Sequence, residues 1–243
     1  MFRRQTNRKG FDVKHFALLM ALLAVPGSAF AQAPAHSHGP GQPAHTHGPA
    51  APGVKPKTTV PATDIAPSYV QLATNVEVIP NIEDAVKSKS AIPTHEGIFG
   101  PLLYAEETRS FFIELQPGMF LAEHPHDVGS IIYTVRGKWV LASEGKRQVM
   151  QAGTLFRFGD KMPTGWEAPF NEPALLLVVK PKGDNTDYDV FNRGLKAMQA
   201  STDKDRKAGK MQFYYSELKP DDPAIAFARS VNPNFDAVLK IKP

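Results

Sequence analysis

The sequence predicts an all-β domain, an antiparallel sandwich or small barrel, followed by a short helical extension. Four closely spaced segments are rich in β-branched and aromatic residues: "RSFFIEL", "SIIYTVRGKWVLAS", "KRQVMQAGTLFRF" and "ALLLVVKP". Turn residues bound them, at Pro117-Gly118, Gly145 and Gly159-Asp160, and no helical pattern lies between them. Short strands at this spacing are typical of sandwiches and small barrels.

The first 31 residues have the pattern of a secretory signal peptide. A basic opening precedes the apolar run "FALLMALLAV" (16–25), and Ala29-Phe30-Ala31 supplies small residues for a cleavage site. The apolar run is too short to span a bilayer, although an uncleaved anchor is the alternative. We expect cleavage after Ala31 and a periplasmic or secreted protein that begins at Gln32 and has no transmembrane segment.

Removing the signal peptide also removes the basic character of the chain. The whole sequence has 28 basic and 24 acidic residues, and residues 1–31 hold five of the basic and one of the acidic, which leaves 23 of each. A near-neutral chain has no electrostatic footprint for nucleic acid, so we expect no nucleic-acid partner. The chain has no cysteine, so disulfides are excluded and the core alone must stabilise the domain.

Residues 32–62 are predicted to be a disordered tether rich in Pro, Ala and His. They contain almost no large apolar side chain, and such a segment cannot offset its chain entropy by burial. A repeat, "AHSHGP" and then "AHTHGP", places four imidazoles on this chain: His36, His38, His45 and His47. They could capture one divalent transition metal, or the segment could be a low-complexity linker that happens to contain histidine.

The folded domain is predicted to span residues 63–243. "YVQLATNVEVIP" (69–80) alternates like a strand, and "IEDAVKSK" (82–89) predicts one or two helical turns. After the four barrel segments, the extension 183–243 opens with a helical pattern in "DYDVFNRGLKAMQAS". The charged link "STDKDRKAGK" and the strand-like "MQFYYSEL" follow. The last element is a short helix in "DPAIAFARSV", which begins at Pro223 with Asp222 as its cap. We expect the extension to pack on the outside of the barrel.

Two motifs in the strand region resemble the signatures of the cupin superfamily. The first comprises Gly118, His124-Pro125-His126, Ser130 and Gly137, with serine where the family has glutamate. The second comprises Gly153, Pro163-Thr164-Gly165, Ala168 and Asn171, with alanine where the family has histidine. The resemblance covers about residues 105–182 and implies a single jelly-roll-like antiparallel barrel.

The resemblance also implies one metal ion, commonly iron, manganese, nickel or zinc, held by three histidines and a glutamate. Side chains two apart on a strand share a face, so His124 and His126 can both point into a barrel, and Ser130 has the same parity. Serine is a poor metal donor and alanine is none, so two imidazoles alone would hold metal weakly. Candidates for a third ligand are Glu167, His95 and Glu106. Alternatively, the pair is an inward-facing remnant bonded to neighbouring groups.

Several other side chains are candidates for lining a pocket. Trp166 and Phe170 flank the alanine at position 168 and could contact an apolar or aromatic ligand, although large aromatics are more often core. Tyr133 and Arg157 lie on predicted strands and could orient a carboxylate or phenolate, although an arginine on a strand is usually exposed.

Two classes of function remain open from the sequence. The first is an exported cupin that binds a small molecule, a divalent metal or both through His124 and His126, without turnover. The second is a metal-dependent cupin enzyme, an oxygenase or isomerase acting on a small phenolic, keto or sugar compound, which requires an acidic third ligand. The resemblance further suggests a homodimer. Fold similarity alone does not decide between these classes.

Overall fold

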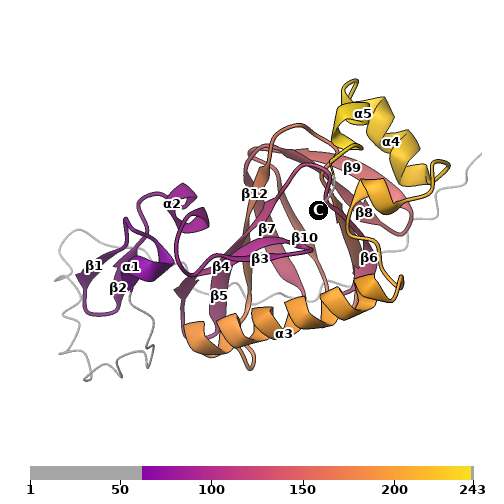
Figure 1. Ribbon diagram of the computed structural model, residues 1–243. Helices are drawn as coiled ribbons and strands as arrows, with labels where there is room; N and C mark the ends of the chain where they lie inside the picture. The colour runs from indigo at the N-terminus through magenta and orange to yellow at the C-terminus, as the bar shows by residue number, and fades with distance from the viewer. Residues whose placement is uncertain (1–61, 242–243) are drawn as a thin grey trace, which may run out of the picture. The chain divides into compact units, whose positions relative to one another are not determined.

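The computed structural model describes residues 62–241 of the 243-residue chain. The predicted signal peptide, and all but the last residue of the predicted tether with its four histidines, lie outside the described residues and stay predictions. Within the described range, two antiparallel sheets and a hairpin are followed by a helical C-terminal region (Figure 1).

The all-β prediction is confirmed: two sheets face each other across a shared apolar interior. The six-stranded sheet has the order β10 (Leu155–Phe158), β7 (Ser130–Arg136), β12 (Ala174–Pro181), β5 (Thr108–Leu115), β4 (Gly97–Tyr104) and β3 (Ile92–Thr94). The four-stranded sheet has the order β6 (Phe120–Pro125), β11 (Pro163–Glu167), β8 (Lys138–Ser143) and β9 (Lys146–Gln151). Among the described residues these remain two separate hydrogen-bonded sheets rather than one closed barrel.

Inward-facing side chains from both sheets form the main core. Ile113 and Leu176 come from the six-stranded sheet, and Trp139 and Met150 from the four-stranded sheet. Trp139 is fully buried and its Nε1 donates a hydrogen bond to Thr134 Oγ1 at 3.0 Å. An indole of this size with its donor satisfied is a large contribution to the stability of the core.

The N-terminal segment covers the outer face of the six-stranded sheet. It comprises α1 (Ala62–Ile65), the hairpin of β1 (Val70–Ala73) and β2 (Val76–Val78), and the single-turn helix α2 (Glu83–Val86). Ala66 and Ala85 pack against Phe112 and Leu175, which point away from the interior. Strands β5 and β12 are therefore buried on both faces, which is why their sequences are apolar at nearly every position.

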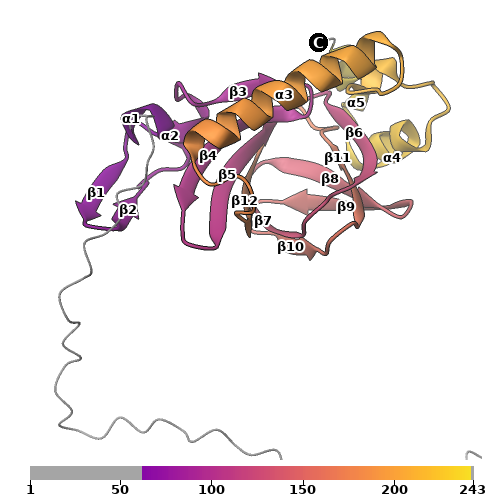
Figure 2. The same cartoon turned by 90° about the horizontal axis from the view of Figure 1, so that it is seen from below.

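Helix α3 (Tyr188–Lys207) lies beside β3 and β4, as Figures 1 and 2 show. Its N-cap is Asp187, whose carboxylate accepts from the backbone N–H of Val190 at 2.9 Å, and its last turn is basic, as the helix dipole favours. Phe191 and Leu195 enter the main core. The prediction of a charged link from residue 201 was wrong for residues 201–207, which continue the helix.

The remaining C-terminal elements pack on the outer face of the four-stranded sheet. They are the 3-10 turn η1 (Tyr215–Glu217), α4 (Pro223–Val231) and α5 (Phe235–Val238). Tyr215 and Phe235 pack against Phe120, whose side chain faces away from the interior. The start of α4 at Pro223 with Asp222 as its cap is confirmed. The strand predicted over residues 211–218 is instead one isolated bridge, Met119 to Tyr214, followed by η1.

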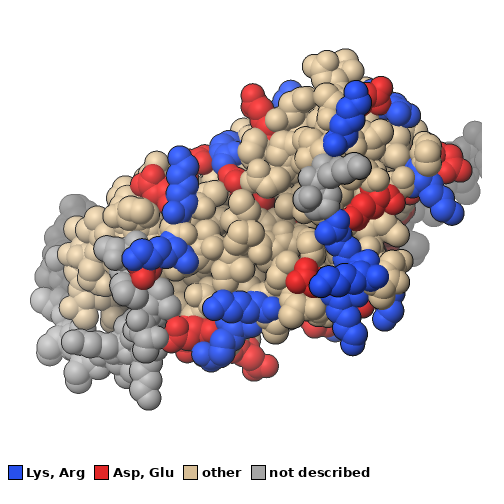
Figure 3. Space-filling view, in the orientation of Figure 1, with Lys and Arg blue, Asp and Glu red and all other residues tan. Residues whose placement is uncertain are grey.

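The surface face seen in Figure 3 carries basic and acidic side chains close to one another rather than one area of a single sign. Several of these charges form exposed ion pairs, such as Lys161 with Asp127 and Arg229 with Asp236. Such exposed pairs contribute little to stability. Among residues 62–241, no helix combines the length and apolar character that crossing a bilayer requires.

Candidate functional site

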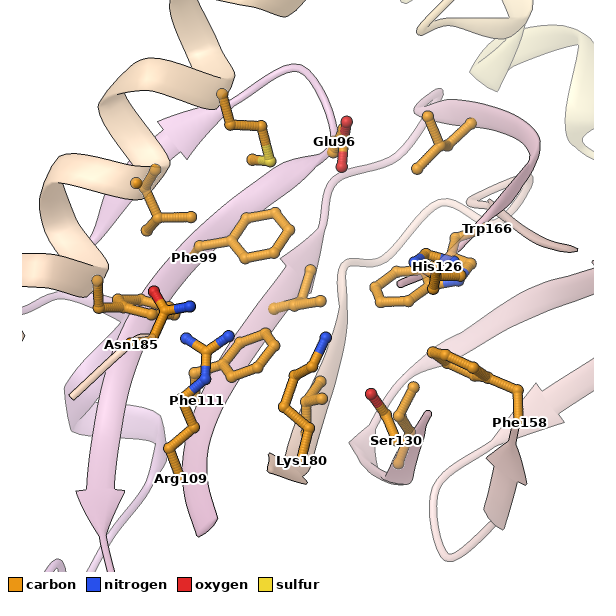
Figure 4. Close-up of a pocket in the computed structure, with 18 of the residues that line it drawn as sticks. Glu96, Phe99, Arg109, Phe111, His126, Ser130, Phe158, Trp166, Lys180 and Asn185 are labelled. Carbon is orange, nitrogen blue, oxygen red and sulfur yellow. The ribbon is translucent and has the colours of Figure 1, made fainter. Parts of the chain in front are cut away.

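A cavity of about 410 Å³ opens between the two sheets next to α3. Its walls come from β4, β5, β6, β7, β10, β11 and β12, from the turn between β3 and β4, and from α3. In Figure 4, Arg109 and Asn185 lie on one side, His126, Trp166 and Phe158 lie on the other, and the amine of Lys180 lies between them.

His124 and His126 both line this cavity, and their ring centroids are 4.4 Å apart. A register shift between β6 and β11 sets this orientation: Trp166 pairs with Leu121 and Thr164 pairs with His124, so β6 has one extra residue there. Such a bulge re-aims the following side chains, and Leu121 and His124 therefore face the same cavity although they are three residues apart.

One nitrogen of each imidazole is held by the protein. His124 Nδ1 is 3.1 Å from its neighbour Ala122 O, and His126 Nε2 is 2.7 Å from Thr164 Oγ1. Phe158 and Trp166 flank the His126 ring, at centroid distances of 4.7 and 6.2 Å. Burial, and then the charges of His124 and Lys180, lower the pKa of His126 to about 4, so the ring is neutral at pH 7.

Of the described residues that line the cavity, Glu96 alone is acidic. It lies in the turn between β3 and β4, and Figure 4 shows it at the rim of the cavity. Burial raises the pKa of its carboxyl group, and the charges of His124 and His95 partly oppose that effect. Glu96 is therefore electrostatically linked to His124, and strand parity could not place it beforehand because it lies in a turn.

The opposite side of the cavity is cationic. Arg109 on β5 and Lys180 on β12 are direct partners in the register of the two strands, and both line the cavity. Burial lowers the pKa of both groups, and for Lys180 the charge of Arg109 adds to the effect. The arginine is 9% exposed and its guanidinium carbon lies 5.4 Å from the Phe111 ring centroid and 5.1 Å from that of Phe191.

Apolar side chains fill the wall between these two polar ends. The aromatic members are Phe99, Phe111, Phe158, Trp166 and Phe191. Aliphatic residues from β5, β6, β7, β12 and α3 complete the wall: Ile113, Leu121, Ile132, Val178, Leu195 and Met198. A mostly apolar concavity with a few convergent polar groups is the usual form of a small-molecule site.

Of the predicted pocket residues, Ser130 and Trp166 line the cavity and four others do not. Tyr133 alternates with the inward Ile132 and is 40% exposed on the outer face of β7. Arg157 likewise points outward between Phe156 and Phe158. Ala168 is buried within the core, and Phe170 lies near Gly137, away from this cavity.

The structure does not bring the predicted third ligands to the histidine pair. Glu167 is 1% exposed on the other face of β11, where Oε1 accepts from Arg147 Nε at 2.9 Å and Oε2 accepts from the Tyr215 hydroxyl at 3.0 Å. His95 is 2.6 Å from Asp203 on α3, and Glu106 is exposed in the turn between β4 and β5. Strand parity explains the first result, since Glu167 is adjacent to the inward Trp166.

The described residues do not fit a metal centre of the kind that cupins often hold. Within residues 62–241, no group of three or more His, Cys, Asp or Glu side chains is arranged to bind one ion. Two imidazoles without a close carboxylate are a weak donor set. The site is better described as a mixed polar and apolar pocket.

Part of the chain is similar to known proteins. Residues 111–180 match the family model described as "Cupin domain". Similar solved structures include the polyketide cyclase RemF from Streptomyces resistomycificus (21% identity, TM-score 0.34), which matches 35% of this chain and 65% of the cyclase. An RmlC-like cupin from Shewanella frigidimarina NCIMB 400 (17%, 0.35) matches 39% of this chain and 83% of its own, and KdgF from Halomonas sp. (16%, 0.34) matches 37% and 83%. None of the curated proteins compared matches the chain.

The fold and the pocket define an antiparallel β-protein with an internal cavity. The family match shows a cupin domain over residues 111–180.

Proposed function

We propose that this cupin is exported and binds a small organic molecule in the cavity between its sheets, with the histidine pair at one end of the ligand. The observation that carries the proposal is the cavity of about 410 Å³, which is lined mainly by apolar residues and by a few polar ones, among them His126, Arg109 and Lys180. An aromatic or alkyl body fits the apolar lining, and the polar groups determine its orientation.

The histidine pair contributes hydrogen bonding in this proposal. His126 Nδ1 and His124 Nε2 are the ring nitrogens that remain after the contacts to Thr164 and Ala122. A neutral His126 ring can donate or accept, according to its tautomer, so a hydroxyl or carbonyl group of the ligand can be accommodated there.

The experiment is a thermal-stability screen with a cavity-blocking variant. Gly194 on α3 lines the cavity, and a Cβ at this position would have only Asn185 Oδ1 within 4 Å, at 3.8 Å. Gly194→Leu should therefore fill part of the cavity and stabilise the helix by up to about 1 kcal/mol. Ala200→Leu, at an exposed position of the same helix, is the matched control.

Ligands that bind should raise the Tm of the wild type and of Ala200→Leu, and should leave that of Gly194→Leu nearly unchanged. A set of aromatic and alkyl compounds that moves none of the three melting curves would refute the proposal. Intact mass of the exported protein, expected to begin at Gln32, tests the export.

A metal-dependent oxygenase or isomerase is the second candidate. Its support is the electrostatic link between Glu96 and His124, which makes Glu96 a candidate for the acidic ligand. Metal content measured after deletion of residues 32–55 tests it, because the deletion removes the tether histidines. Stoichiometric metal that disappears in both His124→Ala and Glu96→Gln would favour this candidate, and metal-free protein that still binds organic ligands would exclude it.

A further inference from the structure

Two cations face each other inside the cavity, and neither forms an ion pair with an acid among residues 62–241. Lys180 and Arg109 are direct cross-strand neighbours on β12 and β5, and both side chains line the cavity. Like charges opposite each other destabilise a sheet, so this pair is unfavourable unless something else compensates it.

The described residues compensate these charges only in part: the charge of the exposed Asp127 raises the pKa of Lys180, and the Tyr104 hydroxyl forms a hydrogen bond with Arg109, which raises the pKa of Arg109. The ion pairs formed within residues 62–241 include neither Arg109 nor Lys180. Arg109 is 9% exposed, and its Nε and Nη1 are buried with no hydrogen-bond partner. Burying guanidinium N–H groups without a hydrogen-bond partner lowers the stability of the folded protein. An apolar residue at this position would avoid that loss.

The surroundings hold the guanidinium in place but do not neutralise it. Its carbon atom lies 5.4 and 5.1 Å from the ring centroids of Phe111 and Phe191, contacts in the range of cation–π interactions. Figure 4 shows the head group of Lys180 between the Arg109 guanidinium on one side and His126 and Trp166 on the other. The cations are therefore positioned before any ligand arrives.

We propose that Arg109 and Lys180 form an anion subsite, and that the ligand of the pocket is a small organic acid with an aromatic or alkyl body. Its carboxylate lies against the two cations, and its body lies along the apolar wall toward His126. This inference rests on the proposed function and specifies its ligand class. A carboxylate suits the subsite because arginine can bind its two oxygens together and Lys180 adds a second charge.

The experiment compares acids with their neutral amides on the full exported chain. Three pairs differ in length: benzoate and benzamide, phenylacetate and phenylacetamide, 3-phenylpropionate and 3-phenylpropanamide. For the pair of best-fitting length, calorimetry should give a Kd for the acid at least about tenfold below that of the amide. In Arg109→Met and in Lys180→Met this preference should fall to about twofold or less, whereas Lys146→Met, at an exposed position of β9, should keep it.

The melting temperature without ligand separates a binding role from a structural one. Because Met keeps an apolar stem and removes a cation that is compensated only in part, Arg109→Met should melt at the wild-type temperature or above it. If that variant melts lower and Arg109→Lys keeps the full acid preference, Arg109 is structural and the inference is wrong.

Failure of the subsite and failure of the pocket give different results. Acids and amides that bind equally well, with binding lost in Gly194→Leu, overturn the anion subsite and leave the proposed function standing. If no acid and no amide of the three pairs binds, the proposed function fails together with this inference.

Discussion

Acidification should destabilise the protein through His126 more than through an ordinary surface histidine. The pKa of His126 in the folded chain is about 4, below its ordinary value of 6.5, chiefly because of burial. Between these two pH values the unfolded chain takes up the proton and the folded chain does not. The contribution of His126 to stability is therefore fully present above about pH 6.5 and falls as the pH drops toward 4.

The size of the effect follows from the same two values. A gap of about 2.5 pH units corresponds to at most about 3.4 kcal/mol. His126 is only partly buried and faces a cavity that admits water, and screening reduces this figure to about 1–2 kcal/mol. The nearby charged or titratable groups are His124, Glu96 and Lys180, and the experiment has to separate their titration from that of His126.

Urea unfolding of the wild type and of His126→Asn, at intervals from pH 4 to 7.5, provides the separation. The difference in unfolding free energy between them should change by about 1–2 kcal/mol across the window, with the wild type losing more on acidification. Histidine NMR signals should give a His126 midpoint near 4 that rises in His124→Asn, because the charge of His124 is the second cause of the lowered pKa. Parallel stability curves, or a midpoint near 6.5, would refute the reasoning.

Three further substitutions test how the sheets are held. Glu167→Ala should cost about 3–5 kcal/mol in urea unfolding, because it leaves the partly buried Arg147 without its carboxylate; a loss below 1 kcal/mol would contradict the buried pair. Trp139→Ala should cost about 3–5 kcal/mol by loss of the largest fully buried side chain, and a cost typical of the surface would place it outside the core. Gly137 has φ +77°, and a Cβ there would lie 2.4 Å from a backbone carbonyl oxygen, so Gly137→Ala should lower Tm clearly more than Gly153→Ala, where φ is +89° but the space is open. Equal losses of Tm at the two glycines would mean that the backbone strain of a positive φ, and not the close contact, determines the effect.

The strands were predictable because the apolar segments end where the turn glycines begin, so both patterns indicate the same strand boundaries. The segment 130–143 divides into β7 and β8 at Gly137. The turn there requires a positive φ, which glycine adopts readily. The C-terminal region was less predictable. "MQFYYSEL" has the composition of a strand, but Tyr215 is fully buried against α5 and bonds to Glu167, and this tertiary environment replaced the strand by a 3-10 turn.

The site was predictable on one wall only. The histidine spacing indicated that His124 and His126 share a face. The bulge that places Leu121 and His124 on the same side depends on pairing with β11, so the sequence of β6 alone does not predict it. Arg109 and Lys180 had a detectable signal, since each has the parity of inward residues, Phe111 on β5 and Val178 on β12. The alternation alone did not show which face of β5 and β12 lines the cavity, because both faces of these strands are apolar.

The substitutions in the ligand motif and the cations across the cavity support one physical account. A fully charged metal centre near His126 would add positive charge to an interior that already contains two cations, and their mutual repulsion would rise in a low-dielectric space. A pocket whose histidines lack the acidic ligand, and whose opposite wall is cationic, is electrostatically suited to an anion instead. Serine at position 130, which lines the cavity, is consistent with this account, because a small neutral residue leaves room and adds no charge. If metal bound tightly at the pair while Arg109 and Lys180 stayed charged and unpaired, this electrostatic argument would be wrong.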